Sequence, residues 1–166
     1  ASGSLSLQYH VVDMNQNGGL GDVVSKNNVL TTNNITEQVA ATYQSNGTDI
    51  WVMAHEYGNN HFLAYPVTAT GFSSVPVISA TGPSHVSCTS NFNSRGEIKF
   101  SPDGHKLAFN GNGIGQNDPS NILALFDFDN ATGIVSNPLN LPFSRGEWGL
   151  SFSPDNTKLY GATWKA

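Results

Sequence analysis

The chain has 166 residues, 38% of them hydrophobic and 10% aromatic, a composition typical of a globular protein with one sizeable core rather than of a disordered segment. Seven Lys and Arg against twelve Asp and Glu give a net charge of −5 and no basic stripe that could neutralise phosphates, so we expect no nucleic-acid partner. No apolar run is long enough to span a bilayer, so we expect no membrane span.

The first predicted element is a strand pair over residues 5–36. Residues 7–14 are rich in apolar side chains, and a Gly-rich turn at 18–21 separates them from a second apolar segment that begins at Val23. This pattern predicts an antiparallel hairpin. It is similar to the second half of a four-stranded unit that recurs further along the chain.

The turn of this hairpin carries a weak calcium motif. Asp13, Asn15 and Asn17 place oxygen-bearing side chains at alternate positions before a Gly, as the first half of a calcium loop does. The twelfth position of that loop is Val24, which cannot supply the bidentate carboxylate. An ordinary Asn-rich turn accounts for the same residues, so calcium stays an alternative and no other cofactor is expected.

A four-stranded unit is predicted over residues 37–80. Alternating polar and apolar residues indicate strands near 37–44, 49–56, 61–68 and 73–79. Asn46-Gly47 between the first two is typical of a tight hairpin turn. The unit is therefore predicted to be an antiparallel sheet.

Three residues near the middle of this unit are candidate ligands. His55 and Glu56 precede a Gly-Asn-Asn turn, and His61 follows it, so a hairpin brings either of the first two opposite the third. With a further ligand they could hold zinc or copper. The alternative is a solvated hairpin tip, because the spacing is not that of a zinc-peptidase helix.

A second four-stranded unit is predicted over residues 95–141, with strands near 95–101, 105–110, 121–128 and 133–140. Its third strand is apolar on both faces. That pattern favours a strand that lies between two other sheets.

A nearly identical line of sequence occurs in residues 100–107 (FSPDGHKL) and 152–159 (FSPDNTKL). Pro followed by Asp and then Gly or Asn is turn chemistry, so each copy predicts a hairpin. The second copy begins a partial unit over 145–164. Repeated four-stranded antiparallel units are typical of β-propeller blades, and a β-sandwich is the alternative.

The predicted fold class is therefore an all-β propeller of about three blade equivalents, all within one domain. A closed propeller needs at least about four blades, so the ring is expected to be incomplete. The chain is then either a fragment of a longer polypeptide or one of several copies that close a ring together.

Loops carry the remaining candidate binding residues, because loops of repeat scaffolds are where ligands bind. Asn112, Gln116 and Asp118 lie in a Gly-rich insertion, and Arg95 ends the connection from residue 81. The single cysteine, Cys88, cannot form an internal disulfide and is interpreted as structural or incidental rather than as a nucleophile.

Asp127 and Asp129 project from one face of a predicted strand, two positions apart. Paired carboxylates could serve glycoside hydrolysis. Their place at a strand end favours a role in the turn.

The repeated lines resemble those of TolB-like and WD40-like bacterial propellers. Further segments resemble the propeller region of secreted surface proteins associated with gliding motility and type IX secretion; they are residues 11–14, 17–23, 46–52, 55–56, 125–129 and 132–133. The resemblance implies an extracellular or cell-surface location in a bacterium. It transfers no catalytic residue.

The expected function is a non-catalytic extracellular module that binds a protein or a glycan, or the remaining blades of its own polypeptide. The alternative is a propeller-type hydrolase or lactonase, or an accessory domain of one, with a metal in the central channel. Inward polar residues converging on the axis would favour the enzyme.

Overall fold

The structure is a computed structural model that describes residues 6–84, 94–111, 121–142 and 147–163. The regular secondary structure of these residues is almost entirely antiparallel β-sheet, with 59% of residues in strands. None of the sheets closes on itself, and the predicted fold class of an incomplete propeller is confirmed. In these ranges no helix has the length and apolarity that a membrane crossing requires.

The chain divides into two compact units, Ala1–Asn34 and Ile35–Ala166. That both belong to one propeller domain stays a prediction. In the first unit, β1 (Leu7–Asp13) pairs antiparallel with β2 (Asp22–Thr31), and the short 3-10 turn η1 (Asn17–Gly19) joins them. The hairpin predicted here is therefore present.

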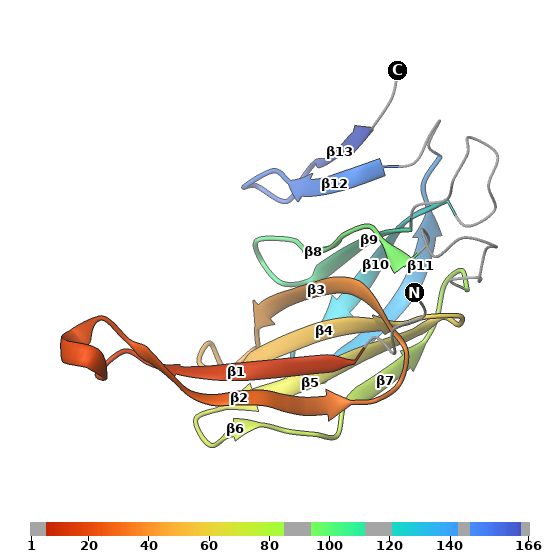
Figure 1. Ribbon diagram of the computed structural model, residues 1–166. Coiled ribbons are helices and arrows are strands. Elements are labelled where there is room, and N and C mark those ends of the chain that lie inside the picture. Colours follow the sequence, from red (N-terminus) through yellow and green to blue (C-terminus); the bar gives the residue numbers. More distant parts are fainter. Residues whose placement is uncertain (1–5, 85–93, 112–120, 143–146, 164–166) are drawn as a thin grey trace. The chain divides into compact units, whose positions relative to one another are not determined.

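The first complete sheet of the second unit contains β3 (Ile35–Tyr43), β4 (Ile50–Glu56), β5 (His61–Thr68) and β7 (Val77–Ala80) in that order, with β6 (Gly71–Phe72) also paired with β5. We call this sheet the first blade. Figure 1 shows it in orange to yellow-green. Its last strand begins later than the predicted 73–79, because residues 73–76 bend between β7 and the short strand β6, which pairs with the end of β5.

The second blade contains β8 (Ile98–Phe100), β9 (Lys106–Gly111), β10 (Ile122–Asp129) and β11 (Ile134–Asn140), again in chain order. Each strand pairs with the next, as the sequence predicts for a blade.

After the second blade, β12 (Glu147–Phe152) and β13 (Leu159–Thr163) form a two-stranded sheet that we call the half-blade. Both copies of the repeated line lie in the turn between a first and a second strand, which confirms the predicted hairpins.

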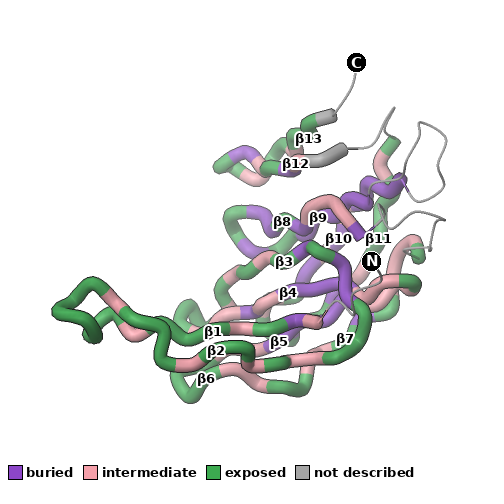
Figure 2. The backbone as a smooth tube through the Cα atoms, viewed as in Figure 1, coloured by how far each residue is buried: buried purple, intermediate pink, exposed green. Residues whose placement is uncertain are grey.

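The core lies between the sheets. One apolar cluster joins the first blade to the second, and it includes Trp51, Phe62, Phe109 and Phe126. A smaller cluster joins the second blade to the half-blade through Ala108, Leu123 and Leu150. Because β10 contributes to both clusters, its two apolar faces are explained by a sheet on either side, as predicted. Figure 2 shows the resulting burial along β9 and β10.

Hydrogen bonds also join the sheets. Trp51 Nε1 donates to the Asn130 carbonyl at 2.9 Å, and Val135 N donates to Ser79 Oγ at 2.9 Å. Asp103 N donates to Asn156 Oδ1 at 3.1 Å, which links the second blade to the half-blade. Sheet faces that share both apolar packing and directed hydrogen bonds fix the blades in one arrangement.

Candidate functional site

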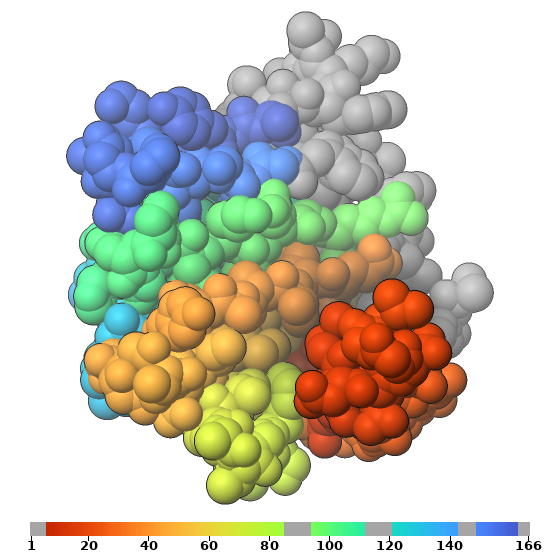
Figure 3. Space-filling view, turned by 90° about the vertical axis from the view of Figure 1, so that its left-hand side faces the viewer, coloured from red at the N-terminus to blue at the C-terminus, as the bar shows by residue number. Residues whose placement is uncertain are grey.

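The first strands of the sheets, β3, β8 and β12, each lie at one edge of their sheet, and β8 contacts both of the others. Figure 3 shows the second blade in green between the first blade in orange and the half-blade in blue. In a propeller such first strands line the central axis. This edge is therefore where a shared binding site is expected.

A cleft of about 530 Å³ lies between β3 and β8. Its walls are residues 39–43 on one side and residues 97–102 on the other, with Ile50 at the end. Ligand sites for small molecules usually have volumes of about 300–1,000 Å³ and few polar groups on apolar walls. The volume of the cleft lies within that range, and its lining combines apolar residues such as Val39, Ile50 and Phe100 with polar ones.

The ionisable residues among those that line the cleft are a glutamate, a lysine and a tyrosine. Lys99 Nζ donates to Glu97 Oε1 at 3.1 Å, and the two side chains are 46% and 31% exposed. The second oxygen of Glu97 accepts from Leu150 N at 2.6 Å, which ties the carboxylate to β12. Tyr43 is 64% exposed at the end of β3. The cleft thus presents a carboxylate held in place, a cation within reach of solvent and an aromatic ring.

Buried polar groups at the start of the two strands hold Glu97 in position. Gln38 Nε2 donates to the Asn110 carbonyl at 2.6 Å, and Glu97 N donates to Asn110 Oδ1. Gly96 adopts φ +140°, and a Cβ there would lie 2.2 Å from the Asn110 carbonyl oxygen and 2.3 Å from Gln38 Nε2. Only glycine lets the backbone at position 96 lie so close to Asn110 and Gln38.

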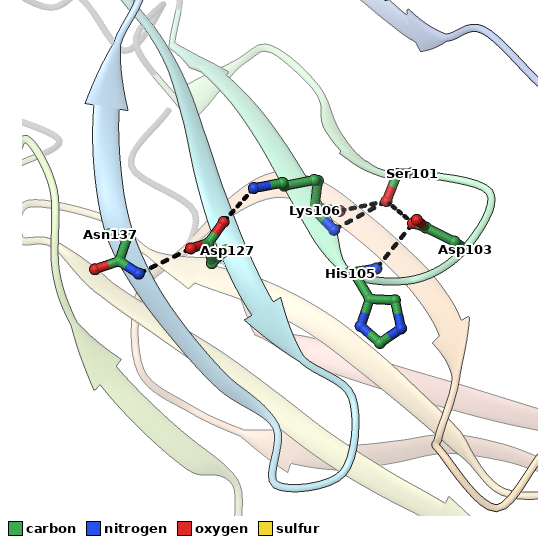
Figure 4. Close-up of polar contacts among 6 residues, drawn as sticks. All are labelled: Ser101, Asp103, His105, Lys106, Asp127 and Asn137. Carbon is green, nitrogen blue, oxygen red and sulfur yellow. Dashed lines mark hydrogen bonds and ion pairs between the residues drawn. The ribbon is translucent and has the colours of Figure 1, made fainter. Parts of the chain in front are cut away.

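The repeated line forms a hydrogen-bonded turn (Figure 4). Ser101 Oγ donates to Asp103 Oδ1 at 2.5 Å and accepts from Lys106 N at 2.9 Å, while His105 N donates to Asp103 Oδ1 at 3.1 Å. The Ser101 hydroxyl is the main cause that holds the pKa of Asp103 below its usual value. These groups close the β8–β9 hairpin, so the motif is structural.

The second copy of the line repeats these contacts. Ser153 Oγ donates to Asp155 Oδ1 at 2.5 Å and accepts from Lys158 N at 2.9 Å. The Ser153 hydroxyl likewise lowers the pKa of Asp155. The same residues therefore make the same turn in two blades.

The two carboxylates of β10 serve strand and turn contacts. Asp127 pairs with Lys106 Nζ and accepts from Asn137 Nδ2 at 2.8 Å, and Asp129 accepts from Thr132 Oγ1 at 2.7 Å (Figure 4 shows Asp127). The Lys106 contact lowers the pKa of Asp127, and the Thr132 hydroxyl lowers that of Asp129. A glycosidase acid needs a raised pKa. The geometry therefore supports the turn role.

The structure separates the histidines near the β4–β5 turn. His55 is buried, with its ring 4.6 Å from that of Phe62 and 4.7 Å from that of Phe109. Glu56, the next residue of β4, lies on the opposite face of the strand from His55. Its carboxylate accepts from His61 Nδ1 at 2.8 Å and from Asn59 Nδ2 at 2.7 Å. Glu56 and His61 are therefore together at the turn, and His55 belongs to the core.

Two further residues that the sequence offers as candidates, Asp13 and Arg95, lie in the described part of the chain. Asp13 accepts from Asn15 N at 2.9 Å and from Gln16 Nε2 at 3.0 Å, so its oxygens take part in the turn, and calcium binding there stays a prediction. Arg95 lies two residues before Glu97 and three before the start of β8.

Four of the residues discussed from the sequence lie outside the described part of the chain: Asn112, Gln116, Asp118 and Cys88. Within the part that is described, no group of three or more His, Cys, Asp and Glu side chains could hold a metal ion.

Sequence reasoning did not single out Glu97, Lys99 or Tyr43. One signal was present: Arg-Gly-Glu precedes both copies of the repeated line, at residues 95–97 and 145–147. The repeat therefore includes the residues that lead into the first strand as well as the turn. That strand lies at the edge of the blade, and Glu97 lies directly before it.

No family model matches the chain, and no curated protein does. Several solved structures are similar to it, and two of them are described here. A proposed 6-phosphogluconolactonase from Bacteroides uniformis ATCC 8492 matches 93% of this chain and 40% of its own, with a TM-score of 0.59 and 12% identity. One from Bacteroides fragilis NCTC 9343 matches 75% of this chain and 31% of its own, with a TM-score of 0.50 and 15% identity.

The likeness shows the fold. At 12% and 15% identity it supports a β-propeller-like architecture and carries no residue roles. The chain spans about 40% of the length of the first protein and 31% of the second. The TolB-like, WD40-like and gliding-motility resemblances remain predictions from the sequence.

Proposed function

We propose that this chain is part of a ligand-binding β-propeller whose cleft between β3 and β8 takes a small anionic sugar derivative, and that the protein hydrolyses a sugar lactone. The observation that carries the proposal is the cleft itself, in which the Lys99 and Glu97 side chains lie 3.1 Å apart. The fold of the proposed 6-phosphogluconolactonases supports this choice of substrate class. It corresponds to the lactonase alternative that the sequence left open.

The side chains suit such a ligand. The Lys99 ammonium is a compact cation that can bind a phosphate or carboxylate. The exposed ring of Tyr43 offers a flat apolar surface for a sugar ring and a hydroxyl for a hydrogen bond. Ile50 and Phe100 add apolar surface to the walls beside these contacts.

Glu97 is the proposed general base. Its carboxylate accepts a proton from a water molecule, whose oxygen then attacks the lactone carbonyl carbon. The tetrahedral intermediate collapses as the ring C–O bond breaks, and the protonated Glu97 gives its proton to the ring oxygen, which yields the open hydroxy acid and restores the carboxylate.

Hydrolysis of 6-phosphogluconolactone, followed as acid release above the spontaneous rate, tests this proposal. We expect Glu97→Gln to lower kcat/KM by about 100-fold or more, the usual contribution of a general base. Asp49→Asn is the matched control, since Asp49 lies in the β3–β4 turn and accepts from Asn46 Nδ2. No hydrolysis by the wild-type chain, or equal rates for the wild type and Glu97→Gln, would overturn the assignment.

A second candidate is a glycan-binding module without turnover. Tyr43 favours it, because an aromatic ring exposed at the rim of a shallow cleft suits stacking on a sugar. The secreted, cell-surface setting predicted from the sequence belongs with this candidate. Binding of an oligosaccharide that Tyr43→Ala abolishes, with no lactone hydrolysis, would favour it over the enzyme.

A further inference from the structure

One ion pair of the cleft joins the proposed general base to the proposed anion-binding cation. Glu97 lies directly before β8 and Lys99 lies two positions further on, so strand geometry puts both side chains on one face. Ile98, between them, is 1% exposed on the other face. Lys99 Nζ donates to Glu97 Oε1 at 3.1 Å. The lysine therefore covers one oxygen of the carboxylate that is proposed to take a proton.

The carboxylate of this pair is held in place from two sides. Its second oxygen, Oε2, accepts from Leu150 N of β12 at 2.6 Å, and Leu150 is buried. Hydrogen bonds to a charged acceptor are among the strong ones. The backbone is held as well, because Glu97 N donates to Oδ1 of the fully buried Asn110. Oε1 is thus the oxygen left for a water molecule, and it is the one to which Lys99 donates.

The lysine is the partner that can move. Its ammonium sits on a flexible four-carbon chain, and the Lys99 side chain is 46% exposed. Ion pairs between side chains this exposed are weak, so another anion can replace the carboxylate. A phosphate monoester has a charge of about −1.5 to −2 at pH 7 and attracts an ammonium more strongly than a carboxylate does. Among the described residues that line the cleft, Lys99 is the one cation, so an anion bound there pairs with it.

We propose that Lys99 covers Glu97 in the free protein and leaves it for the anionic group of the substrate, so that the anion itself uncovers the base. This inference rests on the proposed function of the cleft and adds a condition for turnover. A lactone that carries a phosphate draws Lys99 away and leaves Glu97 Oε1 for the attacking water. A neutral lactone leaves the pair closed, so it is hydrolysed slowly even when it is bound. The selectivity for anionic lactones then shows in kcat as well as in KM.

Hydrolysis of 6-phosphogluconolactone and of gluconolactone, which lacks the phosphate, tests this coupling when both rates are taken above the spontaneous ones. We expect Lys99→Gln to lower kcat/KM for the phosphorylated lactone at least about tenfold. We expect the same variant to raise kcat for the neutral lactone about two- to fivefold, because the base is then always uncovered. A kcat for the neutral lactone that Lys99→Gln lowers or leaves unchanged would overturn the proposal.

Lys106→Gln is the matched control. Lys106 belongs to the same blade, pairs with Asp127 and is 47% exposed, but it does not line the cleft. Its replacement should change neither rate. The role of Glu97 is tested separately in the same assay. No hydrolysis by the wild type, or full activity of Glu97→Gln, would remove the proposed function and this inference with it, whereas a slow Glu97→Gln together with a Lys99→Gln that does not gain on the neutral lactone would remove the inference alone.

Binding of 6-phosphogluconate gives a readout that needs no turnover. In Glu97→Gln the lysine no longer has to leave a carboxylate, so we expect this variant to bind the ligand about two- to fivefold more tightly than the wild type. Glu37→Gln removes the same charge from β3, at a residue that does not line the cleft, and should bind as the wild type does. Equal affinities of Glu97→Gln and the wild type, or an equal gain in Glu37→Gln, would overturn the proposal.

Discussion

The packing of the first blade against the second makes a sharp prediction at Gly133. This residue has φ +79°, and a Cβ there would lie 2.9 Å from Trp51 Cη2 and 3.1 Å from two more ring atoms. The indole cannot retreat freely, because it is 5% exposed and its Nε1 donates to the Asn130 carbonyl at 2.9 Å. Gly133→Ala therefore forces two blades apart.

The expected cost has two parts. A non-glycine residue in the left-handed region costs about 1–2 kcal/mol. Overpacking a fixed core contact adds about 1–3 kcal/mol. We expect Gly133→Ala to lower the free energy of unfolding by about 2–5 kcal/mol in total. Urea unfolding followed by tryptophan fluorescence measures this as a lower midpoint with an unchanged slope.

Gly47→Ala is the matched control. Gly47 has φ +72° in the β3–β4 turn, and a Cβ there would meet nothing within 4 Å. Gly47→Ala should therefore lower the free energy of unfolding only by the cost of a non-glycine residue in the left-handed region, about 1–2 kcal/mol. Placing Gly133→Ala in a Trp51→Phe background should remove the excess, because the outer indole atoms are gone. If Gly133→Ala costs no more than Gly47→Ala, the two blades do not pack as described.

Three further predictions concern the turns and the core. The folded pKa values of Asp103 and Asp155 lie below the ordinary 3.8, so the stabilisation that these carboxylates give is present above that pH and is lost as the pH falls through the folded values. The midpoints of urea unfolding should therefore fall between pH 6 and pH 2. Midpoints that do not change over this range would contradict this prediction. Ser153→Ala should lower the free energy of unfolding by about 1 kcal/mol and weaken that acid dependence, measured in the same titration. Phe109→Ala, at a side chain 1% exposed, should cost about 3–5 kcal/mol in urea unfolding, against less than about 0.5 kcal/mol for Val75→Ala on the surface; equal costs would place Phe109 outside the core.

Local chemistry explains which parts of the fold the sequence could predict. The Ser-Pro-Asp turn closes through groups within five residues of one another, so both copies predict their hairpins correctly. β8 is shorter than the predicted strand over 95–101, because Gly96 at φ +140° breaks the regular backbone before Ile98. Gly96 is needed there because Gln38, which comes from the first blade, lies so close to it. The residues next to Gly96 in the sequence do not predict that contact.

The cleft could not be predicted for the same reason. Tyr43 and Lys99 come from strands more than fifty residues apart and meet only because two blades pack edge to edge. The burial of His55 could be predicted from the sequence, since His55 continues the alternation of Trp51 and Met53, which are both buried on one face of β4. Its proximity to Glu56 along the chain hid that it points into the core.

Calorimetric titration of the chain with 6-phosphogluconate, the hydroxy acid that lactone hydrolysis would yield, tests whether the cleft binds such a ligand. We expect the wild type and Asp49→Asn to bind it with equal Kd. We expect Lys99→Gln to bind it at least about tenfold more weakly, which is about 1.4 kcal/mol. No binding to the wild type, or an equal Kd for Lys99→Gln, would mean that the ligand does not lie in the cleft between β3 and β8.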